Sequence, residues 1–220
     1  MPVPGAIVNL DVVILAGGRG TRLRGLWNDA KCLVPLGDGR PIIEHLVERC
    51  LALAPRRATL LLGAHEEGVL EWMRLRTAKH PSRLIRARTD PPQGTAVALR
   101  RYLAAYSPLV DGPSPDALLV LNGDTLPLFD LDAVLRYHAS RLGAWATIAV
   151  VHDAAAWRDI YAGAAVLGRA AQDAVARDER AVDLAVHLLG AQRFVVPGFL
   201  DVGTPPGFRE ARAWWPREGA

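Results

Sequence analysis

The sequence predicts an α/β fold with a largely parallel sheet, and two observations carry this prediction. Short apolar runs alternate along the chain with amphipathic stretches whose apolar side chains recur at helical spacing. Two of the apolar runs, at 12–16 and 117–121, end directly in glycine-containing turns. A length of 220 residues fits one domain, and 50% hydrophobic with 22% charged residues excludes intrinsic disorder. We therefore expect a single domain over residues 1–220.

The predicted elements alternate from the N-terminus onward. The run at 12–16 is a buried strand, and the helix at 41–53 carries Pro41 in its first turn, where a missing N–H does no harm. The run at 117–121 is the most convincing buried strand and leads into Asn-Gly-Asp. The other elements of this region are expected as strands at 59–62 and 83–88 and helices at 66–76, 95–106 and 131–141.

Beyond a predicted strand at 144–151 the pattern weakens. Strands are expected at 163–167 and 193–196, and helices at 180–189 and 206–215. Trp214 and Trp215 are expected to pack this last helix onto the body of the protein.

Charge and cysteine content exclude several classes of protein. A net charge of +3 gives no basic stripe for nucleic acid and no membrane patch. No apolar run approaches the ~18 residues of a membrane span, and no signal peptide is apparent. Cys32 and Cys50 are expected as buried free thiols. These observations predict a cytoplasmic protein without nucleic-acid or membrane partners.

A glycine-rich turn follows the first strand. It reads Leu15-Ala16-Gly17-Gly18-Arg19-Gly20-Thr21-Arg22, and its glycines let backbone N–H groups approach a phosphate or a base closely. The spacing matches neither the dinucleotide-binding nor the Walker pattern, so a tight strand-to-loop turn is an alternative. Arg22 and Lys31 favour a polyphosphate site, because two cations after such a turn would converge. Lysine is informative here, since only Lys31 and Lys79 of 26 basic residues are lysines.

Five ordered blocks between residues 12 and 210 resemble the sugar-1-phosphate nucleotidylyltransferases. The glycine turn and the segment KCLVPLGDGRP at 31–41 match the patterns L-A-G-G-x-G-T-R-L, P-K-x-L-x-P-V and G-x-P, with Ala30 where the family has proline. The segments at 92–96, 121–125 and 200–205 are similar to the family's P-L-G-T-A, G-G-D and D-x-G-T-P blocks. The compact heptose-1-phosphate and mannose-1-phosphate guanylyltransferases are the most similar members.

The resemblance implies a Rossmann-like three-layer sandwich with a mixed, mostly parallel sheet. It divides the chain into a nucleotide-binding half at about 1–125 and a shortened sugar-binding half at about 126–220. The implied reaction joins a nucleoside triphosphate to a sugar 1-phosphate, releasing pyrophosphate, in a monomer or homodimer. GTP and a heptose or mannose type of sugar are favoured. The alternatives are UTP, dTTP or CTP, and a non-catalytic regulatory paralogue that binds a nucleotide sugar.

The resemblance also implies roles for individual residues. Arg22 would hold the β- and γ-phosphates, and Lys31 would either contact the α-phosphate or bridge the two phosphates. Asp124 and Asp201 would hold Mg²⁺, which prefers carboxylate oxygens. Each carboxylate taken alone is more typical of a turn or a loop, and the ordered set of blocks is what favours metal binding. The expected nucleotide-binding residues are Leu15, Ala16, Gly17, Gly18, Gly20, Thr21, Gln93, Gly94, Thr95, Asn122 and Gly123. Asp124, Gly163 and Arg158 are expected at the sugar.

The chain departs from the family pattern after residue 151. Family members carry a hairpin with a lysine that binds the sugar phosphate, whereas this chain has no lysine after Lys79. We expect that hairpin to be missing. Arg158 then either replaces the lysine or is an ordinary exposed charge, or the acceptor pocket is unusually open.

Overall fold

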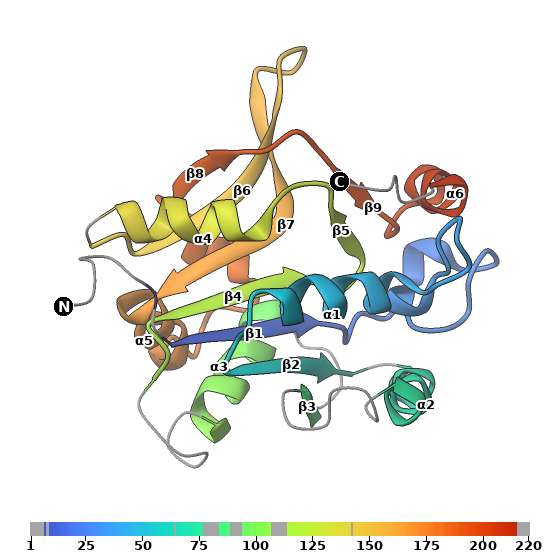
Figure 1. The fold of residues 1–220 in the computed structure, drawn as a ribbon, viewed down its shortest axis with the longest axis horizontal. Helices are drawn as coiled ribbons and strands as arrows, with labels where there is room; N and C mark the ends of the chain where they lie inside the picture. The colour runs from blue at the N-terminus through green and yellow to red at the C-terminus, as the bar shows by residue number, and fades with distance from the viewer. Residues whose placement is uncertain are drawn as a thin grey trace.

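The computed structural model describes residues 7, 9–63, 65–76, 84–88, 94–106, 114–141 and 143–214, with only the main chain of 84–88, 105 and 106. Seven strands form one mixed sheet in the order β3-β2-β1-β4-β7-β6-β8, and β5 pairs with β9 in a separate ribbon. Helices cover both faces of the large sheet (Figure 1). This three-layer arrangement confirms the predicted fold class.

The strands are β1 (Leu10–Leu15), β2 (Arg57–Leu62), β3 (Leu84–Arg88), β4 (Ala117–Asn122), β5 (Thr125–Pro127), β6 (Ala146–Asp153), β7 (Arg158–Gly168), β8 (Gln192–Val195) and β9 (Phe199–Asp201). The α-helices are α1 (Ile42–Ala52), α2 (Glu66–Arg76), α3 (Thr95–Tyr106), α4 (Leu131–Ser140), α5 (Arg169–Arg177) and α6 (Pro205–Ala213). Short 3-10 helices are η1 (Thr21–Leu23), η2 (Lys31–Leu33) and η4 (Leu184–Leu188).

The strands β3, β2, β1 and β4 are parallel to their neighbours. Their apolar side chains alternate between two cores, because successive strand residues point to opposite faces. Ile14 of β1 packs with residues of α1, α2 and α4, whereas the neighbouring Val13 packs with residues of α3, α5 and η4. Parallel strands end at the same edge, so the loops that follow β1 and β4 lie side by side.

The remaining strands of the large sheet, β7, β6 and β8, are not all parallel to their neighbours. β7 is antiparallel to both β4 and β6, and β8 is parallel to β6. β6 and β7 form a hairpin through the turn at 154–157, and this hairpin projects beyond the sheet (Figure 1). The prediction that this region lacks a hairpin is therefore wrong. The predicted strand at 144–151 ends two residues before β6 does, the one at 163–167 begins five residues after β7 does, and the additional residues of the two strands pair with each other.

Most predicted elements are confirmed within two residues, including α2 at 66–76 and α3 at 95–106. Three features differ after residue 168. Helix α5 was not expected, the predicted helix at 180–189 is the short helix η4, and β9 exists only as a three-residue partner of β5. The Asp178 carboxylate accepts hydrogen bonds from the N–H groups of Arg180 and Ala181, which holds this segment in a turn before η4.

The C-terminal helix packs as predicted. The Trp214 ring meets the His45 ring edge-on at a centroid distance of 5.9 Å, and its carbonyl accepts a hydrogen bond from the Gly37 N–H. Trp215 lies outside the described residues. Cys32 and Cys50 are buried free thiols, as expected. Within the described parts of the chain, no helix is both long and apolar enough to cross a bilayer.

Candidate active site

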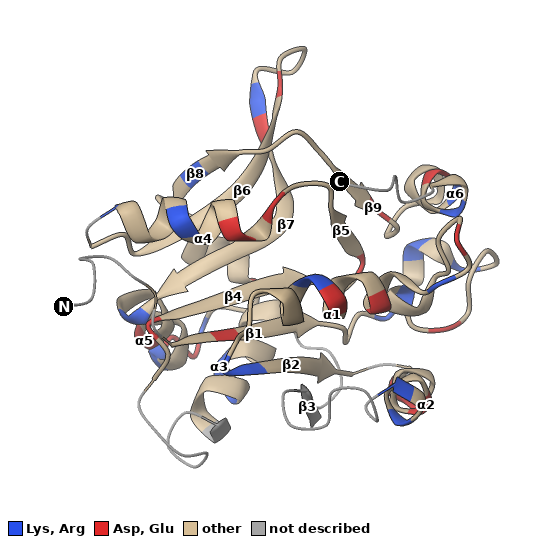
Figure 2. Cartoon of the chain, in the orientation of Figure 1, with Lys and Arg blue, Asp and Glu red and all other residues tan. Residues whose placement is uncertain are grey.

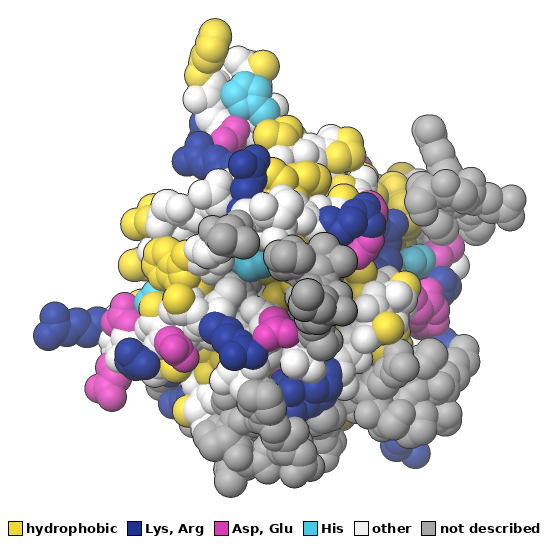
Figure 3. Space-filling view, turned by 60° about the vertical axis from the view of Figure 1, so that its left-hand side comes forward, with side chains coloured by type: hydrophobic (Ala, Val, Ile, Leu, Met, Phe, Trp, Pro, Cys, Tyr) yellow, Lys and Arg dark blue, Asp and Glu magenta, His cyan; other side chains and the backbone are white. Residues whose placement is uncertain are grey.

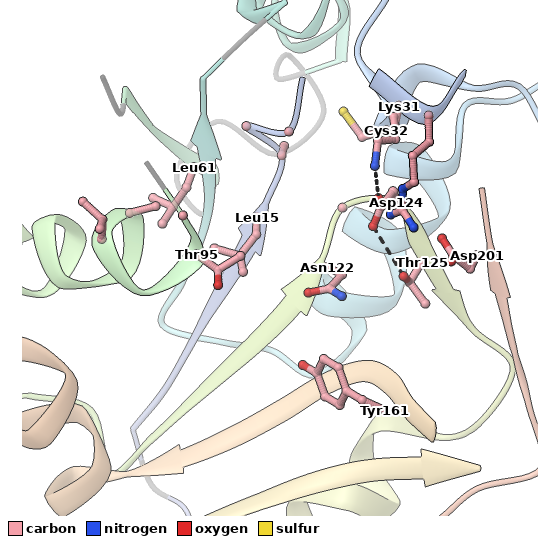
Figure 4. A pocket seen from close by; sticks show the side chains of 18 of the residues that line it. Leu15, Lys31, Cys32, Leu61, Thr95, Asn122, Asp124, Thr125, Tyr161 and Asp201 are labelled. Carbon is pink, nitrogen blue, oxygen red and sulfur yellow. Dashed lines mark hydrogen bonds and ion pairs between the residues drawn. The ribbon is translucent and has the colours of Figure 1, made fainter. Parts of the chain in front are cut away.

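A cavity of about 450 Å³ lies at the carboxyl ends of β1 and β4 (Figure 4). This is the edge where open α/β sheets bind their ligands. Its polar lining residues are Gly17, Gly18, Arg22, Lys31, Cys32, Gly94, Thr95, Arg101, Asn122, Gly123, Asp124, Thr125, Tyr161 and Asp201. Its apolar lining residues are Leu15, Ala16, Leu61, Val97, Ala98, Ile160 and Phe199.

The glycine turn after β1 forms one wall of the cavity. A Cβ on Gly17 would lie 3.2 Å from the Gly63 nitrogen, so this glycine allows the turn to pack against the end of β2. A Cβ on Gly18 would have nothing within 4 Å and would point into open space. Gly20 has φ 65° and leads the chain into η1. The first glycine thus serves packing, and the second leaves room for a ligand.

Two short helices bring the expected cations to the cavity. Arg22 lies on η1 and Lys31 begins η2, and both line the same wall. The Lys31 Nζ donates to Asp124 Oδ2 at 2.6 Å, and both side chains are largely shielded from solvent. Partial burial strengthens the attraction between the two charges, but it also removes both from water, so the loss of either partner would leave an unpaired buried charge.

The returning chain places the second carboxylate beside the first. In the β5–β9 ribbon Thr125 pairs with Asp201, and the Val202 N–H donates to the Asp124 carbonyl at 2.9 Å. The Gly203 N–H donates to Asp201 Oδ1 at 2.7 Å. Two distant sequence blocks therefore meet through backbone pairing.

Three charged side chains converge beside Gly203. A Cβ at that position would lie 2.8 Å from Asp201 Oδ1, 3.1 Å from Asp124 Oδ2 and 3.3 Å from the Arg22 Nη2. No cluster of three or more His, Cys, Asp and Glu side chains suited to a metal occurs among the described residues. Two carboxylates nevertheless fit Mg²⁺, which commonly takes one or two and completes its shell with phosphate oxygens and water.

The opposite wall comes from the start of α3. Gly94 has φ +120°, and a Cβ there would collide with the Val182 carbonyl, so only glycine allows this close approach. The Thr95 hydroxyl donates to Asp183 Oδ1 at 3.0 Å and accepts from the Leu184 N–H at 2.8 Å. These bonds fix the start of α3 to η4. Gln93 lies outside the described residues.

Four predicted site residues lie away from the cavity lining. Gly20 and Thr21 face a neighbouring hollow of about 420 Å³. Gly163 has φ +77°, and a Cβ there would lie 2.7 Å from Thr125 Cγ2, so this glycine lets β7 approach β5. Arg158 is exposed at the start of β7, on the projecting hairpin, and does not line the cavity.

Several lining residues were not singled out from the sequence. Tyr161 and Ile160 reach the cavity from β7, and Arg101 reaches it from α3. Cys32 also lines it, but burial and the nearby Asp124 raise the pKa of this thiol to about 12, which keeps it protonated. The periodicity of α3 could have pointed to Arg101, which follows Val97 and Ala98 by one helical turn.

The fold and these site residues define a nucleotidyltransferase domain. The chain belongs to the family described as the MobA-like NTP transferase domain, whose profile matches residues 12–192. This confirms the resemblance to the sugar-1-phosphate nucleotidylyltransferases, which is supported by individual relatives.

The bifunctional protein GlmU of Azoarcus sp. (strain BH72) is 37% identical over 131 residues, which are 60% of this chain and 25% of that protein. The glucose-1-phosphate adenylyltransferase of Rhodopirellula baltica is 30% identical over 165 residues, 66% of this chain and 36% of that protein. The chain thus spans only a quarter to about a third of the length of these curated relatives.

Solved structures share the fold at lower identity. HddC from Yersinia pseudotuberculosis, complexed with GMP-PN, superposes with a TM-score of 0.71 at 22% identity, covering 91% of this chain and 97% of the other. A UDP-glucose pyrophosphorylase complexed with UDP-glucose gives a TM-score of 0.71 at 14% identity, covering 93% and 97%. At these identities the likeness establishes the fold.

Proposed function

We propose that the chain transfers a nucleotidyl group from a nucleoside triphosphate to a sugar 1-phosphate. An oxygen of the sugar phosphate forms a bond to the α-phosphorus, the bond between this phosphorus and the α–β bridging oxygen breaks, and pyrophosphate leaves. The convergence of Asp124, Asp201 and Arg22 beside Gly203, with Lys31 on Asp124, carries this proposal. This set combines ligands for a cation with cations for a polyphosphate, which is what such a displacement requires.

Each residue has a role in this proposal. Arg22 binds the β- and γ-phosphates and stabilises the leaving pyrophosphate, while Lys31 exchanges its bond to Asp124 for the α-phosphate. Asp124 and Asp201 hold Mg²⁺, which neutralises phosphate charge when it is bound. The attacking phosphate is already ionised, so no side chain needs to act as a general base. Catalysis then consists of positioning and charge neutralisation.

The two substrates take different parts of the cavity in this proposal. The glycine turn, Gly94 and Thr95 bind the nucleotide within a half at about 1–125, and the sugar binds towards the half at about 126–220. GTP and a heptose or mannose type of sugar remain the favoured pair. The HddC structure complexed with GMP-PN supports a guanine nucleotide, whereas the adenylyltransferase and the UDP-glucose pyrophosphorylase support other nucleotides.

A non-catalytic regulatory role is the second candidate. The mannose-1-phosphate guanylyltransferase regulatory subunit alpha of Drosophila melanogaster is 33% identical over 136 residues. The presence of Arg22, Lys31, Asp124 and Asp201 at one cavity favours catalysis, because a regulatory chain would be free to lose them.

Pyrophosphate release by the purified full chain tests the proposal. The assay contains Mg²⁺ and crosses the five nucleoside triphosphates, dTTP among them, with mannose, glucose and heptose 1-phosphates. We expect release with one pair, and none without the sugar phosphate or with EDTA. If no pair releases pyrophosphate and a nucleotide sugar still binds in a thermal-shift assay, the regulatory role would be supported instead.

A further inference from the structure

The Tyr161 side chain has a feature that the proposed reaction leaves unexplained. Its hydroxyl is buried and has no hydrogen-bond partner among the residues that the structure describes. Only two other described side-chain atoms share this condition, Gln172 Oε1 and His187 Nε2, and neither residue lines the cavity. Tyr161 does line it, from β7, with its ring beside the end of β4 (Figure 4).

An unpartnered buried hydroxyl is unfavourable in the free protein. Folding removes it from water without supplying a replacement bond, and native proteins satisfy most such groups. A phenylalanine would fill the same space without that cost. The hydroxyl is therefore explained best by a partner that arrives with the substrate.

The surroundings of Tyr161 define the chemistry of that partner. Burial raises the pKa of its phenol above the ordinary value, and the Asp183 carboxylate raises it further. The group stays a neutral phenol, which both donates and accepts a hydrogen bond. In the proposed reaction phosphate is bound by Arg22 and Lys31 from η1 and η2, whereas Tyr161 reaches the cavity from β7. A neutral group that both donates and accepts a hydrogen bond suits the hydroxyl of a sugar ring.

We propose that Tyr161 determines specificity by hydrogen-bonding one secondary hydroxyl of a sugar ring in the substrate pair. Two rings carry this chemistry, the ribose of the nucleotide and the sugar of the sugar 1-phosphate. The inference rests on the proposed function and deepens it. Its consequence is that the enzyme reacts more slowly with the deoxy analogue that lacks the bonded hydroxyl.

The test compares the full-length chain with Tyr161→Phe on a panel of analogues. The panel holds the 2′-deoxy and 3′-deoxy triphosphates and the monodeoxy sugar 1-phosphates of the accepted pair. The wild type is expected to lose about tenfold in kcat/KM on one analogue, and Tyr161→Phe to lose about tenfold on the natural pair with no further loss on that analogue. The analogue identifies the ring. Equal activity of the two proteins on the natural pair, or equal losses on every analogue, would overturn the proposal.

Thermal unfolding separates this role from a structural one. Tyr161→Phe should unfold at the same temperature or higher, because its hydroxyl has no partner to lose. Tyr102 is the matched control, since its buried hydroxyl interacts with Thr59 and burial raises its pKa to about 12. Tyr102→Phe should unfold at a lower temperature and show the wild-type analogue profile. A lower melting temperature of Tyr161→Phe with uniform losses would assign the hydroxyl to stability.

Failure of the proposed function has a different outcome. A wild type that releases no pyrophosphate with any pair contradicts the proposed reaction. Binding then tests Tyr161, through the melting-temperature shift produced by nucleotide sugars and their deoxy analogues. The Tyr161→Phe chain should bind the parent nucleotide sugar about tenfold more weakly and bind one deoxy analogue as well as the wild type does. Identical affinities in both proteins would refute the inference.

Discussion

The two parts of the large sheet contribute to the cavity in different ways. The parallel part, β3, β2, β1 and β4, supplies the glycine turn, both short helices with their cations and Asp124. The antiparallel part, β7, β6 and β8, supplies only Ile160 and Tyr161. The direction of the strands in each part explains this difference. Parallel strands end at one edge, so residues that follow them gather there, whereas antiparallel strands distribute their ends over both edges.

Charge follows the same division. The central strands are nearly free of charged residues, while the β6–β7 hairpin carries charged side chains along its projecting arms (Figure 2). The Asp159 carboxylate of this hairpin binds His152 of β6 and Arg193 of the neighbouring strand β8. The hairpin stands out from the surface in Figure 3, and Trp157 in its turn is 88% exposed. The charges of the hairpin pair with one another at the surface, whereas those at the parallel edge face the cavity.

The largest expected effect comes from the two carboxylates, which test whether the parallel part of the sheet and the β5–β9 ribbon act together. Asp124→Asn and Asp201→Asn should each lower kcat at least about a hundredfold, because each would remove one of the two carboxylates proposed to hold Mg²⁺. Asp173→Asn on the exposed surface of α5 is the control and should keep full activity. Steady-state pyrophosphate release measures all three. Full turnover by Asp201→Asn in Mg²⁺ would show that Asp201 of β9 has no part in the proposed metal site.

Arg22 and Arg158 compare a charge at the parallel edge of the sheet with a charge on the projecting hairpin. Arg22→Gln should lower kcat about a hundredfold, because its guanidinium faces the cavity beside both carboxylates. Arg158→Gln should leave the KM for the sugar 1-phosphate within about twofold, since surface charges away from a site contribute little. Initial rates at varied sugar 1-phosphate give both values. A large increase in KM for Arg158→Gln would instead show that the hairpin reaches the acceptor.

Predictability from the sequence also differs between the two parts. β1, α1 and α3 were predicted closely because continuous apolar runs and helical spacing are local signals. Helix α5 has a clear helical periodicity, but its buried positions are Ala171, Gln172 and Val175, so few large apolar side chains mark it in the sequence. β9 has three residues and is defined by pairing with β5, which no local pattern encodes.

Prediction of the site from the sequence is limited in the same way, because local motifs do not encode long-range contacts. The motifs identified Arg22, Lys31, Asp124 and Asp201 as candidates, and the structure places all four at one cavity. Their roles in catalysis stay predictions. Motifs could not reveal that Lys31 binds Asp124, because that contact joins residues 93 positions apart. The unpartnered hydroxyl of Tyr161 is equally invisible, since burial and the absence of partners are properties of the assembled walls.

A glycine pair gives the smallest effect and separates ligand approach from packing. Neither Gly18 nor Gly198 has a positive φ, and a Cβ on either would meet nothing within 4 Å. Alanine should therefore stabilise both variants by about 0.4–1 kcal/mol, through the lower entropy of the unfolded chain. Only Gly18 lines the cavity. Gly18→Ala should therefore raise the KM for the nucleotide about tenfold, the usual effect of one extra methyl group in a binding pocket.

Chemical denaturation and initial rates together decide the outcome. A stabilised Gly18→Ala with a higher nucleotide KM, beside a stabilised Gly198→Ala with wild-type kinetics, would show that the glycine is selected by the ligand. An unchanged KM for Gly18→Ala would place the nucleotide away from this wall. The glycines of this turn would then be explained by packing alone, as Gly17 is by its close approach to Gly63.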